Sequence, residues 1–171
     1  MKKHMFFWCA SAILLIALDG CQQSSTARLE ANKDIVRRFA EALNNQEFDA
    51  LDDLVAPDFV RHSQASGELQ AKSRDEFKQL QKEFLKSFPD QRVTTELLIA
   101  EGDYVAAYAT YSGTQEGPMP PFPASGKKAE SKFLSIFRFK EGKIAELWVE
   151  WDNLAMLQQL GHFPPPTMIE K

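Results

Sequence analysis

Residues 137–161 constrain the fold more than any other part of the chain, because their pattern predicts two paired strands followed directly by a helix. Valine, isoleucine, tryptophan and phenylalanine are concentrated on both sides of Glu141 and Gly142, which have the length and the glycine of a tight antiparallel turn. Leucines then recur at every third position from Leu154, and Gly161 is a helix stop signal. This segment therefore predicts a hairpin joined to a short helix.

Side-chain alternation divides the second of these strands into two faces. One face is apolar and reads as packed core: Ala145, Leu147, Val149 and Trp151. The other combines apolar side chains with carboxylates: Ile144, Glu146, Trp148, Glu150 and Asp152. We expect this mixed face to line a pocket. If the strand contains a bulge, the parity shifts and Glu146 and Glu150 lie on a solvated edge instead.

The order of elements elsewhere predicts the fold class. Apolar periodicity and capping signals predict three helices, at residues 29–45, 48–55 and 73–88, and a brief extended piece at residues 59–63. Strands are predicted at residues 92–100, 104–114 and 132–139, with a proline-rich loop between the last two. We expect an α+β domain in which three N-terminal helices pack on a curved, mostly antiparallel sheet that encloses an apolar cavity.

The N-terminus has the charged start and apolar run of a secretory signal over residues 1–20. The run ends in Leu-Asp-Gly before Cys21, which resembles the bacterial lipobox, and the resemblance implies that Cys21 is lipidated. Residues 21–28 then read as a lipidated, flexible tether, residues 29–163 as the folded domain and residues 164–171 as a proline-rich tail. An exported protein on the periplasmic face, anchored in the outer membrane by the lipid on Cys21, is predicted. The alternative is an unmodified thiol after an ordinary signal peptide.

Composition excludes several classes of partner and chemistry. The formal net charge of −4 argues against binding of nucleic acid or of anionic membranes through a basic surface. Three scattered histidines and the absence of closely spaced cysteines argue against a metal site, and no glycine-rich phosphate loop is present. We therefore predict neither a metal nor a cofactor.

Three features of the sequence resemble the SnoaL-like polyketide cyclases, also called the ester cyclase family, within the NTF2-like superfamily of cone-shaped α+β barrels. They are the closing run GKIAELWVEWDNLAMLQQLG, the strand end at residues 111–114 followed by the proline-rich loop with Gly126, and His62 after the third hydrophobic segment. The resemblance covers roughly residues 29–162.

The resemblance implies general acid and base chemistry without a cofactor, namely aldol cyclisation, isomerisation or hydrolysis of a small hydrophobic carbonyl compound. It implies that Asp152 is the acid and base, that His62 points into the same cavity, and that Trp148 belongs to the pocket wall. We expect the remaining substrate contacts to come from Tyr108, Phe137, Glu146 and Phe122.

The residues themselves leave alternatives open. Aspartate is a preferred N-cap, so Asp152 can serve as the cap of the last helix, and the two roles do not exclude each other. Three functions follow: a cyclase-type enzyme, a non-catalytic periplasmic module that holds a hydrophobic ligand or partner in the same cavity, and a scaffold that forms homodimers through an open sheet face.

Overall fold

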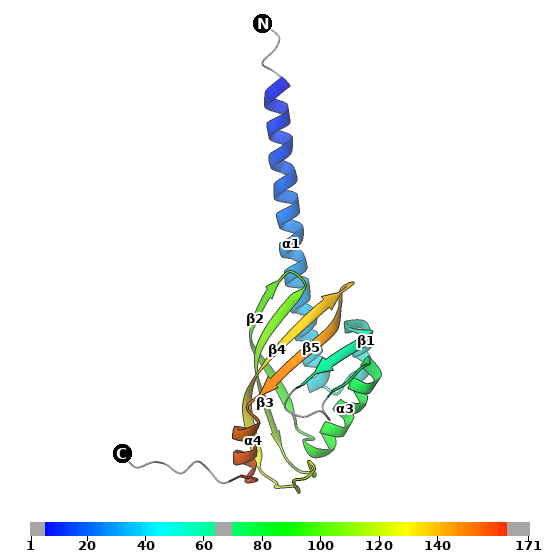
Figure 1. Ribbon diagram of the computed structural model, residues 1–171, viewed down its shortest axis with the longest axis vertical. Coiled ribbons are helices and arrows are strands. Elements are labelled where there is room, and N and C mark those ends of the chain that lie inside the picture. The colour runs from blue at the N-terminus through cyan, green and yellow to red at the C-terminus, as the bar shows by residue number, and fades with distance from the viewer. Residues whose placement is uncertain (1–5, 64–69, 164–171) are drawn as a thin grey trace, which may run out of the picture.

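The structure is a computed structural model that describes residues 6–63 and 70–163, with side chains from residue 25 onward. Its helices are α1 (Phe6–Asn44), a short 3-10 turn η1 (Phe48–Ala50), α2 (Leu51–Leu54), α3 (Arg74–Ser87) and α4 (Asn153–Leu160). Its strands are β1 (Val55–His62), β2 (Arg92–Glu101), β3 (Tyr104–Thr114), β4 (Lys128–Lys140) and β5 (Lys143–Trp151). The predicted α+β class is confirmed (Figure 1).

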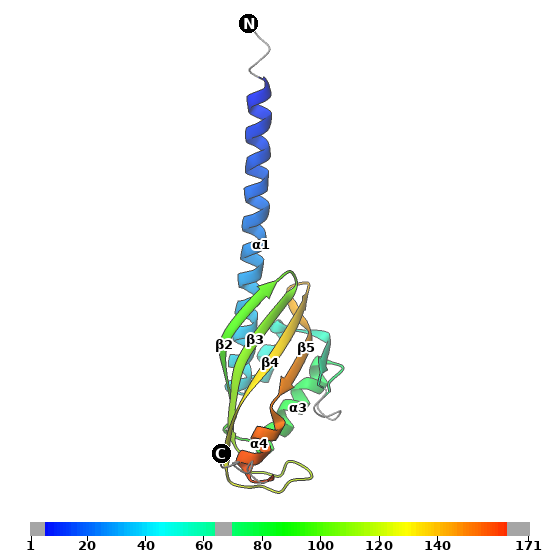
Figure 2. The same ribbon diagram turned by 60° about the vertical axis from the view of Figure 1, so that its left-hand side comes forward.

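The five strands form one sheet in the order β1-β5-β4-β3-β2. The pairs β2–β3, β3–β4 and β4–β5 are antiparallel hairpin neighbours, whereas β1 runs parallel to β5. The predicted turn between β4 and β5 is confirmed, with positive φ angles at Glu141 and Gly142. Figure 2 shows β2, β3, β4 and β5 lying side by side, with α1 behind them.

The core lies between the concave face of the sheet and the helices α1 and α3 (Figure 1). Phenylalanine rings connect these layers: Phe39 of α1 stacks on Phe77 of α3 at a centroid distance of 5.7 Å. Phe39 also meets Phe137 of β4 edge to face at 5.6 Å. Since large rings hold both helices against the sheet, the space beside them keeps a defined shape.

Local signals explain where α3 and α4 begin and end. Ser73 Oγ accepts a hydrogen bond from the Glu76 amide at 3.1 Å, so the predicted capping box starts α3. Gly161 ends α4 in the left-handed conformation at φ 81°, as the stop signal predicts. Both ends follow from hydrogen bonds that neighbouring residues supply.

The first helix differs from the sequence prediction, because α1 is continuous from Phe6 to Asn44 and includes residues 21–28 (Figure 1). The chain carries neither glycine nor proline between Gly20 and Asn44, so nothing in that stretch interrupts a helix. Among the described helices, none combines the length and apolar character that crossing a membrane requires. The boundaries predicted for the signal and tether remain predictions, and the proline-rich tail at residues 164–171 lies outside the described residues.

Candidate functional site

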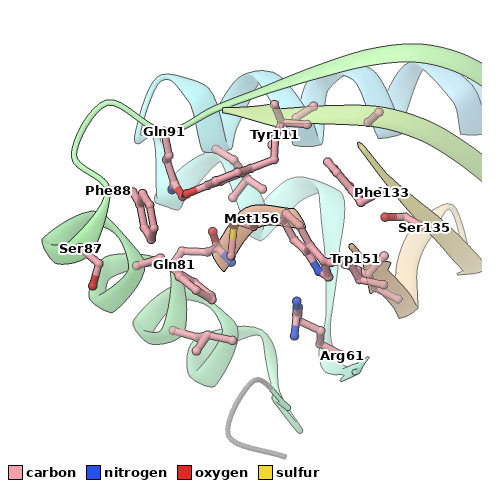
Figure 3. Close-up of a pocket in the computed structure, with 18 of the residues that line it drawn as sticks. Arg61, Gln81, Ser87, Phe88, Gln91, Tyr111, Phe133, Ser135, Trp151 and Met156 are labelled. Carbon is pink, nitrogen blue, oxygen red and sulfur yellow. The ribbon is translucent and has the colours of Figure 1, made fainter. Parts of the chain in front are cut away.

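A cavity of about 740 Å³ lies between the concave face of the sheet and the two long helices (Figure 3). The loop at residues 115–127 and helix α4 border one end of it. Most of its wall is apolar and comes from every layer of the fold: Val36, Phe39, Leu43, Phe77, Leu80, Phe84, Phe88, Val93, Ala107, Ala109, Phe133, Phe137, Leu147, Val149, Met156 and Leu157. Its size and lining are those of a small-molecule site.

A few polar side chains interrupt the apolar wall. Arg61 enters from β1, Gln81 from α3 and Ser135 from β4, and each is at least nine-tenths buried. Trp151, at the end of β5, presents its indole ring to the same space. A mostly apolar cavity with a few convergent polar groups can hold a hydrophobic molecule and fix its orientation.

Arg61 is the most unusual of these groups, since its residue is only 3% exposed. Burial lowers the pKa of its guanidinium to about 10, and the charge of Glu150 acts in the opposite direction. The group therefore stays positively charged at neutral pH. The backbone of Arg61 is fixed by paired hydrogen bonds with Ala71, which holds the base of the side chain in place.

Trp151 adds a buried indole N–H to the polar groups of the cavity. Phe133 stacks on its ring at a centroid distance of 4.5 Å, and Tyr111 meets it edge to face at 5.3 Å. Its Nε1 is buried and has no hydrogen-bond partner among the described residues. Figure 3 shows this nitrogen turned toward the guanidinium of Arg61. The indole is thus a fixed donor that a bound molecule can satisfy.

Tyr111 contributes a third donor. Burial, and secondarily the charge of Asp90, raise the pKa of its phenol well above the ordinary value. The hydroxyl stays protonated and donates a long hydrogen bond of 3.5 Å to Gln91 Oε1. Tyr111 is therefore suited to donate a hydrogen bond and unsuited to act as a base.

The rim of the cavity carries an ion pair and the proline-rich loop. Lys86 pairs with Glu83 at 2.6 Å, and both side chains are at least half exposed. Phe122 of the loop lines the cavity and stacks on His162, with centroids 4.6 Å apart. His162 Nε2 lies 2.8 Å from Oε1 of the fully buried Gln115, so His162, which follows Gly161 at the end of α4, holds the start of the loop against the domain.

Asp152 does not point into this cavity. Its carboxylate is exposed, accepts a hydrogen bond from the Ala155 amide at 2.9 Å and caps α4. The neighbours on either side, Trp151 and Asn153, line the cavity. The alternative role considered from the sequence, the helix cap, is confirmed, and the expected position of Asp152 in the pocket is wrong.

The sequence prediction also assigned the wrong face of β5 to the pocket. Leu147, Val149 and Trp151 line the cavity, because the core face and the pocket face of this sheet are one face. The pairing register between β4 and β5 shifts after Arg138, so buried Ile144 does not share a face with Glu146. This shift is the bulge considered from the sequence.

Four other predicted site residues lie on the outer face of the sheet. His62 stacks on Trp148 at a centroid distance of 4.8 Å, and its Nε2 lies 3.0 Å from Glu146 Oε2. Tyr108 lies on the same outer face and is 38% exposed. The structure therefore brings His62, Trp148 and Glu146 together, but away from the cavity.

Two of the predicted contacts do line the cavity. Phe137 reaches it from β4 and is 5% exposed, and Phe122 reaches it from the loop. Their expected position is confirmed, while contact with a substrate remains a prediction.

Sequence reasoning missed Arg61 as a cavity residue. The signal that could have revealed it is side-chain alternation along the strand. Phe59, Arg61 and Ser63 are two positions apart, so their side chains point to the same face, and all three are buried. A cation on the inward parity of a strand is uncommon unless it has a partner or a function. Trp151 was assigned to the core, which is correct, but the orientation of its nitrogen cannot be read from spacing.

No cluster of three or more histidine, cysteine, aspartate or glutamate side chains suited to holding a metal ion occurs in the described part of the chain. The interior of the cavity instead contains hydrogen-bond donors and one buried cation. Its chemistry is that of recognising or polarising an oxygen atom.

A curved five-stranded mixed sheet with helices on its concave face and a cavity between the layers defines an NTF2-like α+β barrel. The sequence model of the SnoaL-like polyketide cyclases matches residues 33–160. The chain belongs to this family, and the resemblance inferred from its motifs is confirmed.

Solved structures of similar proteins agree with this assignment. IdmH from Streptomyces antibioticus, assigned provisionally as a polyketide cyclase, is 29% identical over 76% of this chain and 98% of its own, with a TM-score of 0.67. TsrD from Streptomyces laurentii is 26% identical over 78% of this chain and 97% of its own, with a TM-score of 0.70. An LEH-like epoxide hydrolase from M. tuberculosis, 16% identical over 78% of this chain and 92% of its own, shares the fold at a TM-score of 0.64. No curated protein matches the sequence.

Proposed function

We propose that this protein binds a small hydrophobic carbonyl compound in the cavity between the sheet and the helices. The observation that carries the proposal is an apolar cavity of about 740 Å³ whose buried interior presents Arg61, Trp151 and Tyr111. Apolar walls would hold the hydrocarbon part of the ligand, and these donors would pair with its oxygen.

Catalysis of the cyclase or isomerase type is the second candidate, and the match to the SnoaL-like family favours it. The cationic Arg61 and the indole N–H of Trp151 would stabilise negative charge on a carbonyl oxygen as an enolate forms. General acid and base catalysis by Asp152 would require its exposed carboxylate to leave the cap of α4. Binding without turnover needs no such movement, so we place it first.

Filling the cavity tests this proposal. Ala109 is 2% exposed and lines the cavity, whereas Ala106, three positions earlier on β3, is exposed on the outer face. We expect the full chain to bind N-phenyl-1-naphthylamine, an uncharged fluorescent lipophile whose emission rises in apolar surroundings. Ala109→Phe should weaken this binding at least about tenfold, because the added ring occupies the cavity and one tenfold step corresponds to about 1.4 kcal/mol.

The matched control is Ala106→Phe, which adds the same ring outside the cavity and should leave the probe affinity within about twofold. Equal binding by the two variants, or an absence of binding by the unmodified chain, would refute the proposal.

We further propose that the protein is exported and anchored at the periplasmic face of the outer membrane through a lipid on Cys21. The support comes from the sequence alone, which has a charged start, an apolar run and a cysteine in a lipobox-like context. Cells expressing the chain and fed a radioactive fatty acid should label it, and Cys21→Ser should remove the label. Equal labelling of the two proteins would exclude lipidation at this residue.

A further inference from the structure

The helix wall of the cavity carries one amide side chain on a stripe that is otherwise apolar. Gln81 lies four positions after Phe77 and three before Phe84 on α3, so these three side chains share the face of the helix that lines the cavity. Gln81 is only 8% exposed, and Figure 3 shows it pointing from α3 into the cavity. An apolar residue here would continue the stripe, so core packing alone does not account for the carboxamide.

The carboxamide of Gln81 has no hydrogen-bond partner among the described residues, although it can donate two hydrogen bonds and accept others. A buried amide without a partner costs free energy, and water that enters the cavity can supply the missing bonds until a ligand displaces it. A ligand that offers only hydrocarbon at this place leaves the amide unpaired. A site of this kind therefore discriminates against ligands that lack a polar group facing α3.

The sheet wall, across the cavity from α3, carries two further polar groups that have no partner among the described residues. Trp151 Nε1 is buried, and Ser135 is 3% exposed and lines the cavity. Trp151 pairs across the strands with Phe133, and Ser135 pairs with Val149 in the neighbouring position, so both groups belong to one wall. Unpaired polar groups thus face the cavity from two sides, with apolar side chains between them.

We infer that Gln81 is a specificity-determining residue, which selects carbonyl compounds that carry a hydroxyl group on the side facing α3. A hydroxyl both donates and accepts, so it matches the carboxamide of Gln81, while the carbonyl oxygen accepts from Trp151 Nε1 and Ser135 Oγ on the opposite wall. The inference rests on the proposed function, because it names a second polar group of the molecule that the same cavity binds.

Two ketones that differ by one hydroxyl test the inference. Calorimetric titration of the full chain at pH 6.5 compares 6-hydroxy-2-acetonaphthone, whose hydroxyl is neutral at this pH, with 2-acetonaphthone. Without recognition the hydroxy ketone would bind more weakly, because its hydroxyl loses water on entering an apolar cavity. We expect it instead to bind at least about fivefold more tightly, since its hydroxyl pairs with Gln81.

Gln81→Met removes the carboxamide and keeps the length of the side chain. It should weaken the hydroxy ketone about fivefold or more, leave 2-acetonaphthone within about twofold and so abolish the preference. Because the carboxamide has no partner among the described residues, the same substitution should raise the urea midpoint of unfolding. The matched control is Gln79→Met, which changes an exposed glutamine of the same helix and should keep the preference.

Two further variants keep the test decisive if Gln81→Met does not fold. Gln81→Asn retains the amide but shortens its reach by one methylene, so it should reduce the preference for the hydroxy ketone. Trp151→Phe preserves the aromatic wall but removes the N–H, so it should weaken both ketones several-fold and leave the ratio of their affinities unchanged.

The outcomes separate the two claims. Equal affinity for the two ketones, tighter binding of 2-acetonaphthone, or a preference that survives in Gln81→Met overturns the role of Gln81, while binding of N-phenyl-1-naphthylamine still upholds the proposed function. A lower urea midpoint in Gln81→Met with the preference intact identifies a structural residue and also overturns it. If both ketones and N-phenyl-1-naphthylamine fail to bind, the proposed function and the inference fall together.

Discussion

Glu146 is the residue through which several side chains on the outer face of the sheet interact. Its carboxylate accepts a hydrogen bond from Arg138 Nε at 2.8 Å, and His62 Nε2 lies 3.0 Å from its other oxygen. The hydrogen bond from Arg138, followed by that from His62, holds the pKa of Glu146 below its ordinary value of 4.5. Only 23% of the side chain is exposed, so solvent screens these contacts in part.

This lowered pKa makes stability depend on pH in acid. Because folded Glu146 binds a proton less readily than the unfolded chain does, its contribution is fully present above about pH 4.5 and is lost as the pH falls through the folded value. We predict that urea unfolding at pH 6.0, 4.5 and 3.5 shows declining stability, and that Glu146→Gln declines less. Glu101→Gln, which alters an exposed carboxyl at the end of β2, should follow the unmodified protein. A decline of equal size in all three proteins would contradict this role.

The sequence alone could not show that Arg61, rather than His62, faces the cavity. His62 attracts attention as a familiar catalytic type, yet it lies on the outer face, while its neighbour Arg61 is buried at the cavity. Adjacent residues of a strand point to opposite faces, so a choice between them depends on knowing which face is inward. Position 61 lies on the edge strand β1, and Arg61 pairs with Leu147 of β5, 86 positions further along the chain. The local sequence pattern does not contain that information.

At the scale of elements, helix α4 allows a direct test of an N-cap that could be predicted from the local sequence. Asp152→Ala should lower the free energy of unfolding by about 1 kcal/mol, because it removes the side chain that accepts from the Ala155 amide. Asp152→Asn keeps a good capping residue, so its free energy of unfolding should stay within a few tenths of a kcal/mol of that of the unmodified protein. Urea denaturation of both variants checks this.

The Asp152→Asn variant also tests whether the carboxylate of Asp152 contributes to binding in the cavity. Since the Asp152 carboxylate lies outside the cavity, Asp152→Asn should also leave the affinity for N-phenyl-1-naphthylamine unchanged. A large loss of stability in Asp152→Asn, or none in Asp152→Ala, would contradict the capping role.

Elements with self-contained signals could be predicted from the sequence, and elements set by distant contacts could not. The capping box of α3, the turn at Gly142 and the stop at Gly161 each depend on residues within one turn of chain. The parallel pairing of β1 with β5 depends on strands far apart in sequence. The inward face of β5 follows from that pairing, so the expected pocket residues were assigned to the wrong side.

At the scale of the whole molecule, the outer face of the sheet carries a continuous apolar patch. Cross-strand pairing aligns Leu97 with Tyr108 and Leu134, and in the next row aligns Ile99 with Ile136. The apolar side chains of this patch are substantially exposed: Leu97, Ile99, Tyr104, Tyr108, Leu134 and Ile136. Ion pairs between Lys132 and Glu96 and between Arg138 and Glu146 flank it, so each end of the patch presents both signs of charge.

We propose that a second copy of the chain covers this patch. A patch that presents both charge signs can complement its own copy after a twofold rotation, and apolar patches of this extent usually mark interfaces. Sedimentation of the full chain should give twice the monomer mass, and Leu134→Glu should give monomers. Leu154→Glu, which changes an equally exposed leucine on α4, should leave the dimer intact. A monomeric unmodified chain, or dimers that persist in Leu134→Glu, would refute the proposal.

The parallel contact between β1 and β5 also bears on how the protein is synthesised. The strand that carries Arg61 has its ladder partner at residues 144–148, near the end of the chain. A nascent polypeptide that has reached only β4 lacks this partner, and the wall that Leu147, Val149 and Trp151 supply does not yet exist. The cavity can therefore close only after β5 has left the ribosome, and a product that ends before β5 would lack this wall.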